Sequence, residues 1–437
     1  MNSKVPAEGA TGPLMDDCFQ PGQPRLRHDE ALSLLKSRLS CLVPAVQLDL
    51  QSASGRTLAE AASATTPVPA HTNAAVDGYA FAHSAYVVPG REIGMTIAGR
   101  AAAGHPFPYP VAPREAIRIF TGAVMPEATD TVVMQEDVEV IADGSFVVIP
   151  AGLKAGANVR KAGEDVAAGS ALFARGDTLR PQDLAALASI GRSHVTCFER
   201  VRVAIVSTGD EVRPVGSRPL APGEVYDANA PMLAALANNA GANVTALGIW
   251  PDTADEVRER LAAAALDYDV ILTSGGASLG EEDHMSRALS ALGQRHLWQL
   301  AIKPGRPMMF GQIRSGARDC VVVGLPGNPV AVFVCFLMYV FPLLRAAGGA
   351  HWPEPRRYQI PAAFEFKGRK QGRREFWRGR LVETPAGMVA EKFARDGSGL
   401  ISGLRWSDGL IDIPEDTGDI AIGDAVAFIP FSELGIV

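Results

Sequence analysis

The chain has 437 residues, more than a single hydrophobic core usually organises, so we expect roughly two to four domains. Apolar residues make up 47% of the sequence and charged residues 20%, a composition typical of a globular protein. The net charge of −7 argues against nucleic acid as the main partner, and any anionic ligand would have to be held by local cationic groups.

The composition and hydrophobic spacing change several times along the N-terminal part of the chain. Residues 1–24 are rich in Gly and Pro and should form a flexible tail, and apolar residues then recur at helical spacing from Arg27 onward. Residues 66–162 alternate short β-type runs with Gly and Pro turns, which indicates a small β-rich domain. Helical spacing returns between Leu179 and Ile190.

The segment 199–350 alternates strands and helices as a doubly wound parallel sheet does. Continuous apolar strands, such as Asp269–Thr273 and Cys320–Val323, are of the kind buried on both faces. The apolar run Val330–Leu344 is too short to span a bilayer and is interpreted as a buried helix. Residues 355–437 again alternate like strands and predict a C-terminal β domain.

Cysteine usage and the N-terminus indicate the compartment. The five cysteines are scattered and form no Cys-x-x-Cys pair, so we expect neither a disulfide framework nor a zinc site. The N-terminus lacks the basic and then apolar layout of a secretory signal. We therefore expect a cytoplasmic protein with no membrane partner.

The tripeptide Ser274-Gly275-Gly276 follows an apolar strand and precedes the carboxylates Glu281, Glu282 and Asp283. Two glycines let the main chain approach an anion closely, and the N–H groups of a helix start favour negative charge. Carboxylates would repel that anion unless a hard cation such as Mg²⁺ lay between them. The alternative is that these carboxylates only complement the helix dipole.

Several polar segments should meet at one edge of the predicted sheet, because ligands of open α/β sheets bind beyond the carboxyl ends of the strands. Ser207–Glu211, Ser274–Gly276 and Gly324–Asn328 all follow strands. Lys303 and Arg306 add two cations spaced to grip an oxyanion, although plain surface charge is the alternative. In the β-rich domain, Asp77-Gly78 is as consistent with a turn as with a site.

A series of motifs stands in a fixed order along the chain. They are Asp77–Ala80, Ile119–Ala123, Gly163–Asp165, Ser207–Glu211, Ser274–Gly276, Lys303–Gly305 and Leu325–Pro329. Together they resemble the molybdopterin molybdenumtransferase family, that of bacterial MoeA and the gephyrin E-domain.

The resemblance implies an α/β multidomain fold with a doubly wound α/β molybdopterin-binding domain. The implied parts are a discontinuous linking and dimer domain of mixed structure (25–65 and 163–198), an inserted β-rich domain (66–162), the α/β domain (199–350) and a C-terminal β-barrel-like domain (355–437).

The resemblance also implies an activity. Members of the family take adenylylated molybdopterin and molybdate, cleave the adenylate with Mg²⁺ or a similar cation, and leave molybdenum on the dithiolene. A homodimer with shared active sites is implied, as is transient contact with the molybdopterin adenylyltransferase. In that dimer Asp77, Thr121 and Asp165 would reach across to the site of the other subunit.

The residues carried over from the family fall into two groups. The implied catalytic residues are Asp77, Thr121, Asp165, Glu211, Asp252 and Asp283, with Glu211 and Asp283 as the Mg²⁺ ligands. The implied substrate-binding residues are Ser274, Gly275, Gly276, Ser278, Lys303, Arg306, Pro326, Gly327, Asn328, Arg374 and Ser398. Arg306 stands where relatives often have Lys. The positive charge is kept, but a compact ammonium group is replaced by a planar guanidinium group that can donate two parallel hydrogen bonds. Arg374, otherwise part of a solvated basic hairpin, becomes a residue of the molybdate end.

Two other functions remain open at this point. The Ser-Gly-Gly and Pro-Gly-Asn-Pro elements also occur in single-domain molybdopterin adenylyltransferases, whereas the additional β domains here favour the metal-inserting step. A non-catalytic scaffold or paralogue is the other alternative, and this chain shows no added binding module that would favour it.

Overall fold

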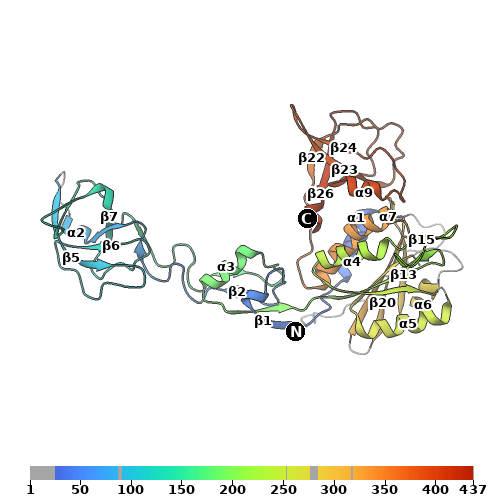
Figure 1. Cartoon of the computed structure of the whole chain (residues 1–437), viewed down its shortest axis with the longest axis horizontal. Coiled ribbons are helices and arrows are strands. Elements are labelled where there is room, and N and C mark those ends of the chain that lie inside the picture. The colour runs from blue at the N-terminus through green and yellow to red at the C-terminus, as the bar shows by residue number, and fades with distance from the viewer. Residues whose placement is uncertain (1–24, 87–90, 252, 276–283, 316–317, 437) are drawn as a thin grey trace, which may run out of the picture.

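Figure 1 shows a computed structural model of the chain, described here for residues 25–86, 91–251, 253–275, 284–315 and 318–436. The molecule is elongated. A β-rich domain lies at one end, a small linking domain lies in the middle, and the α/β and C-terminal domains lie together at the other end. The predicted α/β multidomain architecture is confirmed.

The inserted β-rich domain is a mixed sheet with the strand order β7-β4-β6-β5-β9-β8. Its elements are β4 (Gly78–Phe81), α2 (His83–Tyr86), β5 (Ile93–Ala101), β6 (Glu115–Ile119), β7 (Thr131–Met134), a 3-10 turn (Gln135–Asp137), β8 (Glu139–Ile141) and β9 (Phe146–Ile149). The chain enters the domain through β3 (Asn73–Ala74) and leaves it through β10 (Val159–Arg160), and these two strands pair with each other.

The linking domain is built from segments that lie on both sides of the insertion. Its elements are β1 (Ala45–Asp49), a 3-10 turn (Leu50–Ser52), β2 (Ala62–Ser63), β11 (Ala171–Phe173), α3 (Pro181–Ser189) and β12 (His194–Phe198). Strand β1 pairs with β12, and β2 pairs with β11. Helix α1 (His28–Arg38) lies elsewhere than expected, because Ala31 and Leu35 are buried in the core of the α/β domain. The linking domain therefore lacks this helix, contrary to expectation.

The α/β domain has one sheet with the strand order β16-β13-β17-β21-β20-β18. Its elements are β13 (Arg202–Thr208), β14 (Val212–Arg213), β15 (Val225–Tyr226), α4 (Asn229–Asn239), β16 (Asn243–Trp250), α5 (Ala254–Asp267), β17 (Val270–Ser274), α6 (His284–Leu292), β18 (Gln294–Gln299), β20 (Pro307–Ser315) and β21 (Arg318–Leu325). Strands β16, β13, β17 and β21 are parallel, and β20 and β18 extend the sheet in antiparallel fashion.

Both faces of this sheet are buried, which explains its uninterrupted apolar strands. Leu272 of β17 points into the core on the side of α4, while its neighbour Ile271 points into the core on the side of α5 and α6. Successive side chains of a strand alternate between faces, so each strand contributes to both cores. The prediction of a doubly wound sheet is confirmed.

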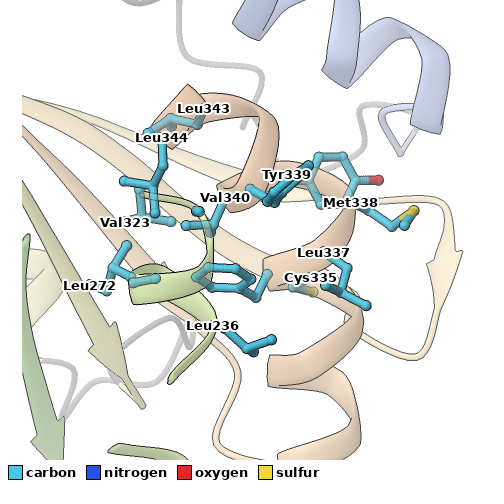
Figure 2. Close-up of a cluster of buried hydrophobic side chains, with 14 of the residues drawn as sticks. Leu236, Leu272, Val323, Cys335, Leu337, Met338, Tyr339, Val340, Leu343 and Leu344 are labelled. Carbon is cyan, nitrogen blue, oxygen red and sulfur yellow. The ribbon is translucent and has the colours of Figure 1, made fainter. Parts of the chain in front are cut away.

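The longest helical segment crosses the larger of these two cores (Figure 2). It consists of α7 (Pro329–Cys335), a π-helical turn (Phe336–Val340) and α8 (Phe341–Ala347). The N–H of Phe341 bonds to the carbonyl of Phe336, so the wide turn comes directly before Pro342, which has no N–H to donate. Among the described residues, Pro329–Ala347 is the one helix long and apolar enough to cross a bilayer, yet 89% of its most apolar stretch is buried inside the protein. The run Val330–Leu344 is therefore a core helix, as predicted.

The C-terminal domain is a curved sheet that almost closes on itself. Its elements are β22 (Tyr358–Pro361), β23 (Arg374–Thr384), β24 (Gly387–Lys392), α9 (Ser402–Trp406), β25 (Gly409–Ile413), β26 (Ala425–Pro430) and a 3-10 turn (Phe431–Leu434). Strand β24 pairs with β23, and Ala362, just after β22, bridges to Ala390 of β24. The short strand β19 (Ile302–Lys303) of the α/β domain pairs with β23, so the two domains share a sheet edge.

Candidate functional site

A cavity of about 430 Å³ lies between the α/β domain and the C-terminal domain. We call it the interdomain pocket. The predicted substrate-binding residues that line it are Gly275, Lys303, Arg306, Pro326, Gly327, Asn328 and Ser398. Segments more than a hundred residues apart in the sequence therefore meet at one place, as the strand-end argument predicted.

The first wall of the pocket is the carboxyl edge of the parallel sheet. Ser274, which ends β17, pairs with Ser207 of β13 on one side and with Leu325 of β21 on the other. Gly275 has φ +88°, and a Cβ there would lie 2.8 Å from Oγ1 of Thr208, so the position requires glycine. This close approach brings the loops after β13, β17 and β21 side by side.

Asn229, at the start of α4, joins two of these loops. Its Nδ2 donates to Oγ of Ser274 and to the carbonyl oxygen of Gly327, both at 2.7 Å. The side chain is buried, so neither hydrogen bond competes with bulk water. Asn229 therefore fixes the spacing of the two loops that line the pocket.

The second wall is the loop that carries Lys303 and Arg306. Nζ of Lys303 lies 3.6 Å from Oε2 of Glu375 in the C-terminal domain, and Nε of Arg306 donates to Oε1 of Gln299 at 2.6 Å. Gly305, between them, has φ +101°, and a Cβ there would lie 2.2 Å from Sγ of Cys335. Burial raises the pKa of the Cys335 thiol well above its usual range, so this cysteine packs and does not react.

The third wall comes from the C-terminal domain. Arg378 of β23 donates to the carbonyl oxygens of Leu400 at 2.9 Å and Arg395 at 2.6 Å, which holds the loop that carries Ser398. The carbonyl of Ser398 in turn accepts a hydrogen bond of 3.0 Å from the N–H of Val330 in α7. The loop is thus fixed at both domains.

The lining of the pocket is positively charged on balance. Among the described residues it includes the cations Lys303, Arg306, Arg378 and Lys392, against the single carboxylate of Asp396, which pairs with Lys392 at 2.5 Å. The aromatic residues Phe376, Trp377 and Phe393 also line it. A planar, anionic ligand suits such a surface.

Sequence reasoning missed the contribution of β23. Arg378 and the aromatic residues Phe376 and Trp377 belong to a run whose alternation predicts only a strand. The available signal was Arg378 directly after two aromatic residues, because a buried guanidinium needs acceptors or an anionic ligand. Lys392 and Asp396 carried no comparable signal.

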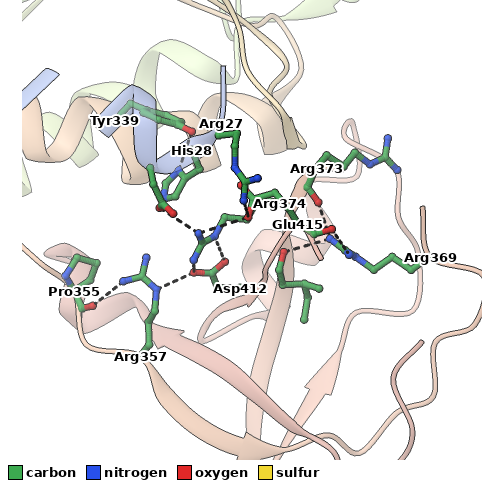
Figure 3. A network of polar contacts seen from close by, with 12 residues as sticks. Arg27, His28, Tyr339, Pro355, Arg357, Arg369, Arg373, Arg374, Asp412 and Glu415 are labelled. Atoms are coloured by element: carbon green, nitrogen blue, oxygen red, sulfur yellow. Dashed lines mark hydrogen bonds and ion pairs between the residues drawn. The ribbon is translucent and has the colours of Figure 1, made fainter. Parts of the chain in front are cut away.

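Arg374 does not line the interdomain pocket. Its Nε and Nη2 donate to the two carboxylate oxygens of Asp412 at 2.6 and 2.9 Å, and its Nη1 donates to Asp29 at 3.2 Å (Figure 3). The bidentate pair lies between α1 and the C-terminal sheet, next to the buried His28. Arg374 therefore links α1 to the C-terminal sheet, and its expected place at the molybdate end stays a prediction.

The residues of the inserted domain lie far from the pocket of their own chain (Figure 1). Asp77 accepts hydrogen bonds from the N–H and from Oγ1 of Thr121, both at 2.8 Å, and these bonds lower the pKa of its carboxyl group. Asp165 is exposed in the stem that leads to the domain. The structure brings Asp77 and Thr121 together but does not bring them, or Asp165, to Lys303.

Of the two expected metal ligands, Glu211 and Asp283, the structure describes only the first. Glu211 is an exposed carboxylate on the loop after β13, and its oxygen donors suit a hard cation such as Mg²⁺. Asp283 lies outside the described residues, as do Asp252, Gly276 and Ser278. Within the described part of the chain, no group of three or more His, Cys, Asp or Glu side chains is arranged to hold a metal ion.

Family models match three successive parts of the chain. Residues 26–191 match the MoeA N-terminal region (domain I and II), residues 204–346 a probable molybdopterin binding domain, and residues 359–431 the MoeA C-terminal region (domain IV).

Individual relatives cover most of the sequence. The chain is 35% identical to the molybdopterin molybdenumtransferase of Haemophilus influenzae, over 93% of this chain and 98% of the relative. It is 32% identical to molybdopterin molybdenumtransferase 2 of Mycobacterium tuberculosis, over 86% and 93% of the two chains. The crystal structure of a molybdopterin biosynthesis MoeA protein from Pyrococcus horikoshii matches with a TM-score of 0.78 at 27% identity, over 93% and 100% of the two chains. The chain therefore belongs to the molybdopterin molybdenumtransferase family and is a transferase of molybdenum cofactor biosynthesis, as its motifs predicted.

Proposed function

We propose that this transferase inserts molybdenum from molybdate into adenylylated molybdopterin with release of AMP, and that the interdomain pocket holds the anionic end of the reaction. The observation that carries the proposal is the set of cations on the pocket wall, Lys303, Arg306, Arg378 and Lys392. Molybdate is a dianion, and a chain with a net charge of −7 repels it unless local cations offset that charge.

The cations act on charge that develops during the reaction. A unit charge pair about 4 Å apart at the protein surface interacts by roughly 4 kcal/mol, so two or more cations can outweigh the repulsion of the remaining protein. Lys303 and Arg306 approach the ligand from one loop, and Arg378 approaches it from the opposite domain. Their positions are fixed before the ligand binds, which favours stabilisation of a developing anion over mere attraction.

The sheet edge would hold the pterin and phosphate part of the substrate. Gly275 and Gly327 present main-chain atoms without side chains in the way, and Asn229 keeps their loops at a fixed distance. Trp377 and Phe393 add apolar surface to the lining beside which a planar ring system could lie.

Glu211, exposed on the loop after β13, supports a magnesium site at the same edge, and the second implied ligand, Asp283, lies outside the described residues. Mg²⁺ bound there would neutralise charge on the phosphates as the phosphoanhydride breaks. The contribution of the chain is then to hold the exposed carboxylate of Glu211 beside the strand ends. The assay below therefore includes Mg²⁺ and a chelator control.

The inserted domain supports a homodimer with shared sites. The hydrogen-bonded pair of Asp77 and Thr121 lies at the surface, far from the pocket of its own chain. A second copy of the chain would bring this pair to a pocket, and the two sites of such a dimer would each contain residues of both subunits. We place this dimer in the cytoplasm, where it would receive its substrate from the molybdopterin adenylyltransferase.

The test is AMP release from purified protein supplied with molybdopterin adenylate and Mg²⁺, with and without molybdate. We expect release that depends on molybdate and that a metal chelator abolishes. ATP-dependent formation of molybdopterin adenylate would instead identify an adenylyltransferase, and a folded dimer that catalyses neither reaction would favour a scaffold or a degenerate paralogue.

A matched pair of variants tests the pocket itself. Arg306→Met removes a cation from the pocket wall, whereas Arg314→Met removes one that is 78% exposed on β20 and pairs with Asp319. Arg306→Met should raise the molybdate concentration at half-maximal turnover about tenfold, and Arg314→Met should leave it unchanged. Equal effects of the two variants would show that net charge, and not the pocket, attracts the anion.

A further inference from the structure

Glu375 is a buried carboxylate that lies directly behind the interdomain pocket. It belongs to β23 and pairs in register with Lys303 of β19, and its side chain is 2% exposed. Oε2 lies 3.6 Å from Nζ of Lys303 and accepts a hydrogen bond of 2.9 Å from Nε1 of Trp377. Lys303 and Trp377 line the pocket, while Glu375 itself does not.

The other oxygen of Glu375 contacts two arginines of the C-terminal domain. Oε1 accepts a hydrogen bond of 3.1 Å from Nε of Arg373, and Nε of Arg369 lies 4.0 Å from it. Burial acts to raise the pKa of this carboxyl group, but the hydrogen bond from Trp377 and the charges of Lys303 and Arg373 outweigh it and hold the pKa below its usual range. Glu375 is therefore a fixed negative charge that contacts two pocket residues from behind.

The long side chain of Lys303 needs such a contact to occupy one position. A lysine stem has several rotatable bonds and loses considerable conformational entropy when its ammonium group is held in place. The side chain of Lys303 is about one-third exposed, and its ammonium group contacts Glu375 on the buried side. The partner lies in the C-terminal domain, so it also fixes Lys303 relative to Arg378 on the opposite wall.

A second buried carboxylate in the same sheet provides a comparison. Asp412 of β25 is as deeply buried as Glu375, and its partners are Arg374 and Arg357. Neither of these arginines lines the interdomain pocket. The two carboxylates thus have the same chemistry and burial, but only one of them contacts residues of the pocket.

From this difference we propose that Glu375 is a positioning residue, which orients the ammonium group of Lys303 toward the anionic ligand in the pocket. The proposal rests on the proposed function of the pocket. Glu375 does not touch the ligand, and its effect on binding passes through Lys303.

The test is a double-mutant cycle in the full-length protein with Glu375→Gln and Lys303→Met. Gln keeps an oxygen that can accept from Trp377 but removes the charge that holds Lys303. Turnover is measured as AMP release against molybdate concentration, and direct binding of molybdate and of tungstate is measured by calorimetry. Glu375→Gln should raise the half-saturating molybdate concentration about tenfold with a smaller change in kcat, and the double variant should bind no more weakly than Lys303→Met.

Controls separate positioning from folding. Asp412→Asn should lower the melting temperature about as much as Glu375→Gln does, yet leave the half-saturating molybdate concentration unchanged in either Lys303 background. Glu375→Asp keeps the charge but draws it back by one methylene, so it should give an intermediate effect, and it replaces Glu375→Gln if that variant fails to fold.

Several outcomes would overturn the inference. Effects of Glu375→Gln and Lys303→Met that multiply would show that Glu375 does not act through Lys303, and so would a loss of kcat with unchanged molybdate dependence. Wild-type protein that binds molybdate but releases no AMP would contradict the proposed chemistry alone, because the calorimetric cycle still tests Glu375. Wild-type protein that binds neither oxyanion would overturn both.

Discussion

The two ends of the molecule present their polar residues in different ways. At the interdomain pocket each charged group is held by a partner, as Lys303 is by Glu375 and Arg306 is by Gln299. In the inserted domain Asp77 accepts hydrogen bonds from Thr121, and neither residue is buried. One end is thus a cationic surface organised within a single chain, whereas the other carries a carboxylate that meets no cation of the pocket in its own chain. Under the proposed function, each end would supply half of a shared site.

The largest expected effect tests whether the two halves meet between subunits. Asp77→Asn and Lys303→Met homodimers should each lose at least about 100-fold in molybdate-dependent AMP release. A hybrid dimer that carries one change in each chain would combine an intact pocket with an intact inserted domain at one of its two sites. Co-expression with two affinity tags isolates the hybrid, which should recover about half of the wild-type activity.

Two results would decide against the shared site. A hybrid as inactive as its parents would place both residues in the same functional unit of one chain. An Asp77→Asn homodimer that stays active would show that Asp77 only stabilises the backbone turn in which it lies. A hybrid of Lys303→Met with wild type serves as the control, and it should also retain about half of the activity.

The next effect concerns stability at the pocket end. His28 is buried, and its Nδ1 lies 2.9 Å from the hydroxyl of Tyr339. Burial, helped by the charges of Arg374 and Arg357 and opposed by those of Asp412 and Asp29, lowers the pKa of His28 from 6.5 to about 4. The unfolded chain therefore takes up this proton at a higher pH than the folded chain does.

The sign of the effect follows from this difference. As the pH falls from 6.5 to 4, the unfolded state gains the proton first, and stability falls by up to about 3 kcal/mol. Urea unfolding of wild type and His28→Gln at a series of pH values measures it, and the variant should lack this part of the decrease. Equal slopes for wild type and His28→Gln would contradict the prediction.

A smaller effect is expected where the main chain approaches itself at the pocket. Gly275→Ala would place a Cβ 2.8 Å from Oγ1 of Thr208 at a φ of +88°, at a cost of about 2 kcal/mol. The strained loop should also bind substrate more weakly. Gly122→Ala in the inserted domain is the matched control, because it too has positive φ, at +80°, but meets no atom within 4 Å. Chemical denaturation of both variants should show the larger loss for Gly275→Ala.

The smallest effect concerns the orientation of one cation. Gln299→Ala removes the acceptor of Nε of Arg306 but keeps the charge of the guanidinium group. We expect the half-saturating molybdate concentration to rise about threefold with kcat little changed. In an Arg306→Lys background, Gln299→Ala should not raise the half-saturating molybdate concentration further, because a lysine has no planar guanidinium group to orient. A persistent effect in that background would show that Gln299 acts on another group.

The sequence predicts the pocket half of the site better than the other half. Strand ends followed by glycine are local signals, so the residues alone suffice to place Gly275, Gly327 and the loop of Lys303 at one edge of the sheet. Sequence cannot tell Arg374 from Arg378, because both are basic residues of one strand and only tertiary contacts show that Asp412 takes the first of them. The expected place of helix α1 in the linking domain is wrong for a similar reason. Its apolar spacing indicates a buried face, but not which domain buries it.

The stem of the inserted domain has a mechanical consequence. The chain passes out through β3 and back through β10, two strands of two residues each that pair with one another. A two-stranded ribbon has little stiffness of its own, and a small bend at its base displaces the far end of an elongated arm by a much larger distance. The precision with which Asp77 arrives at another subunit would then be decided at the hinge and not at the catalytic groups. Substitutions around Val68 and Val166, which bridge across that stem, would alter turnover without touching any substrate.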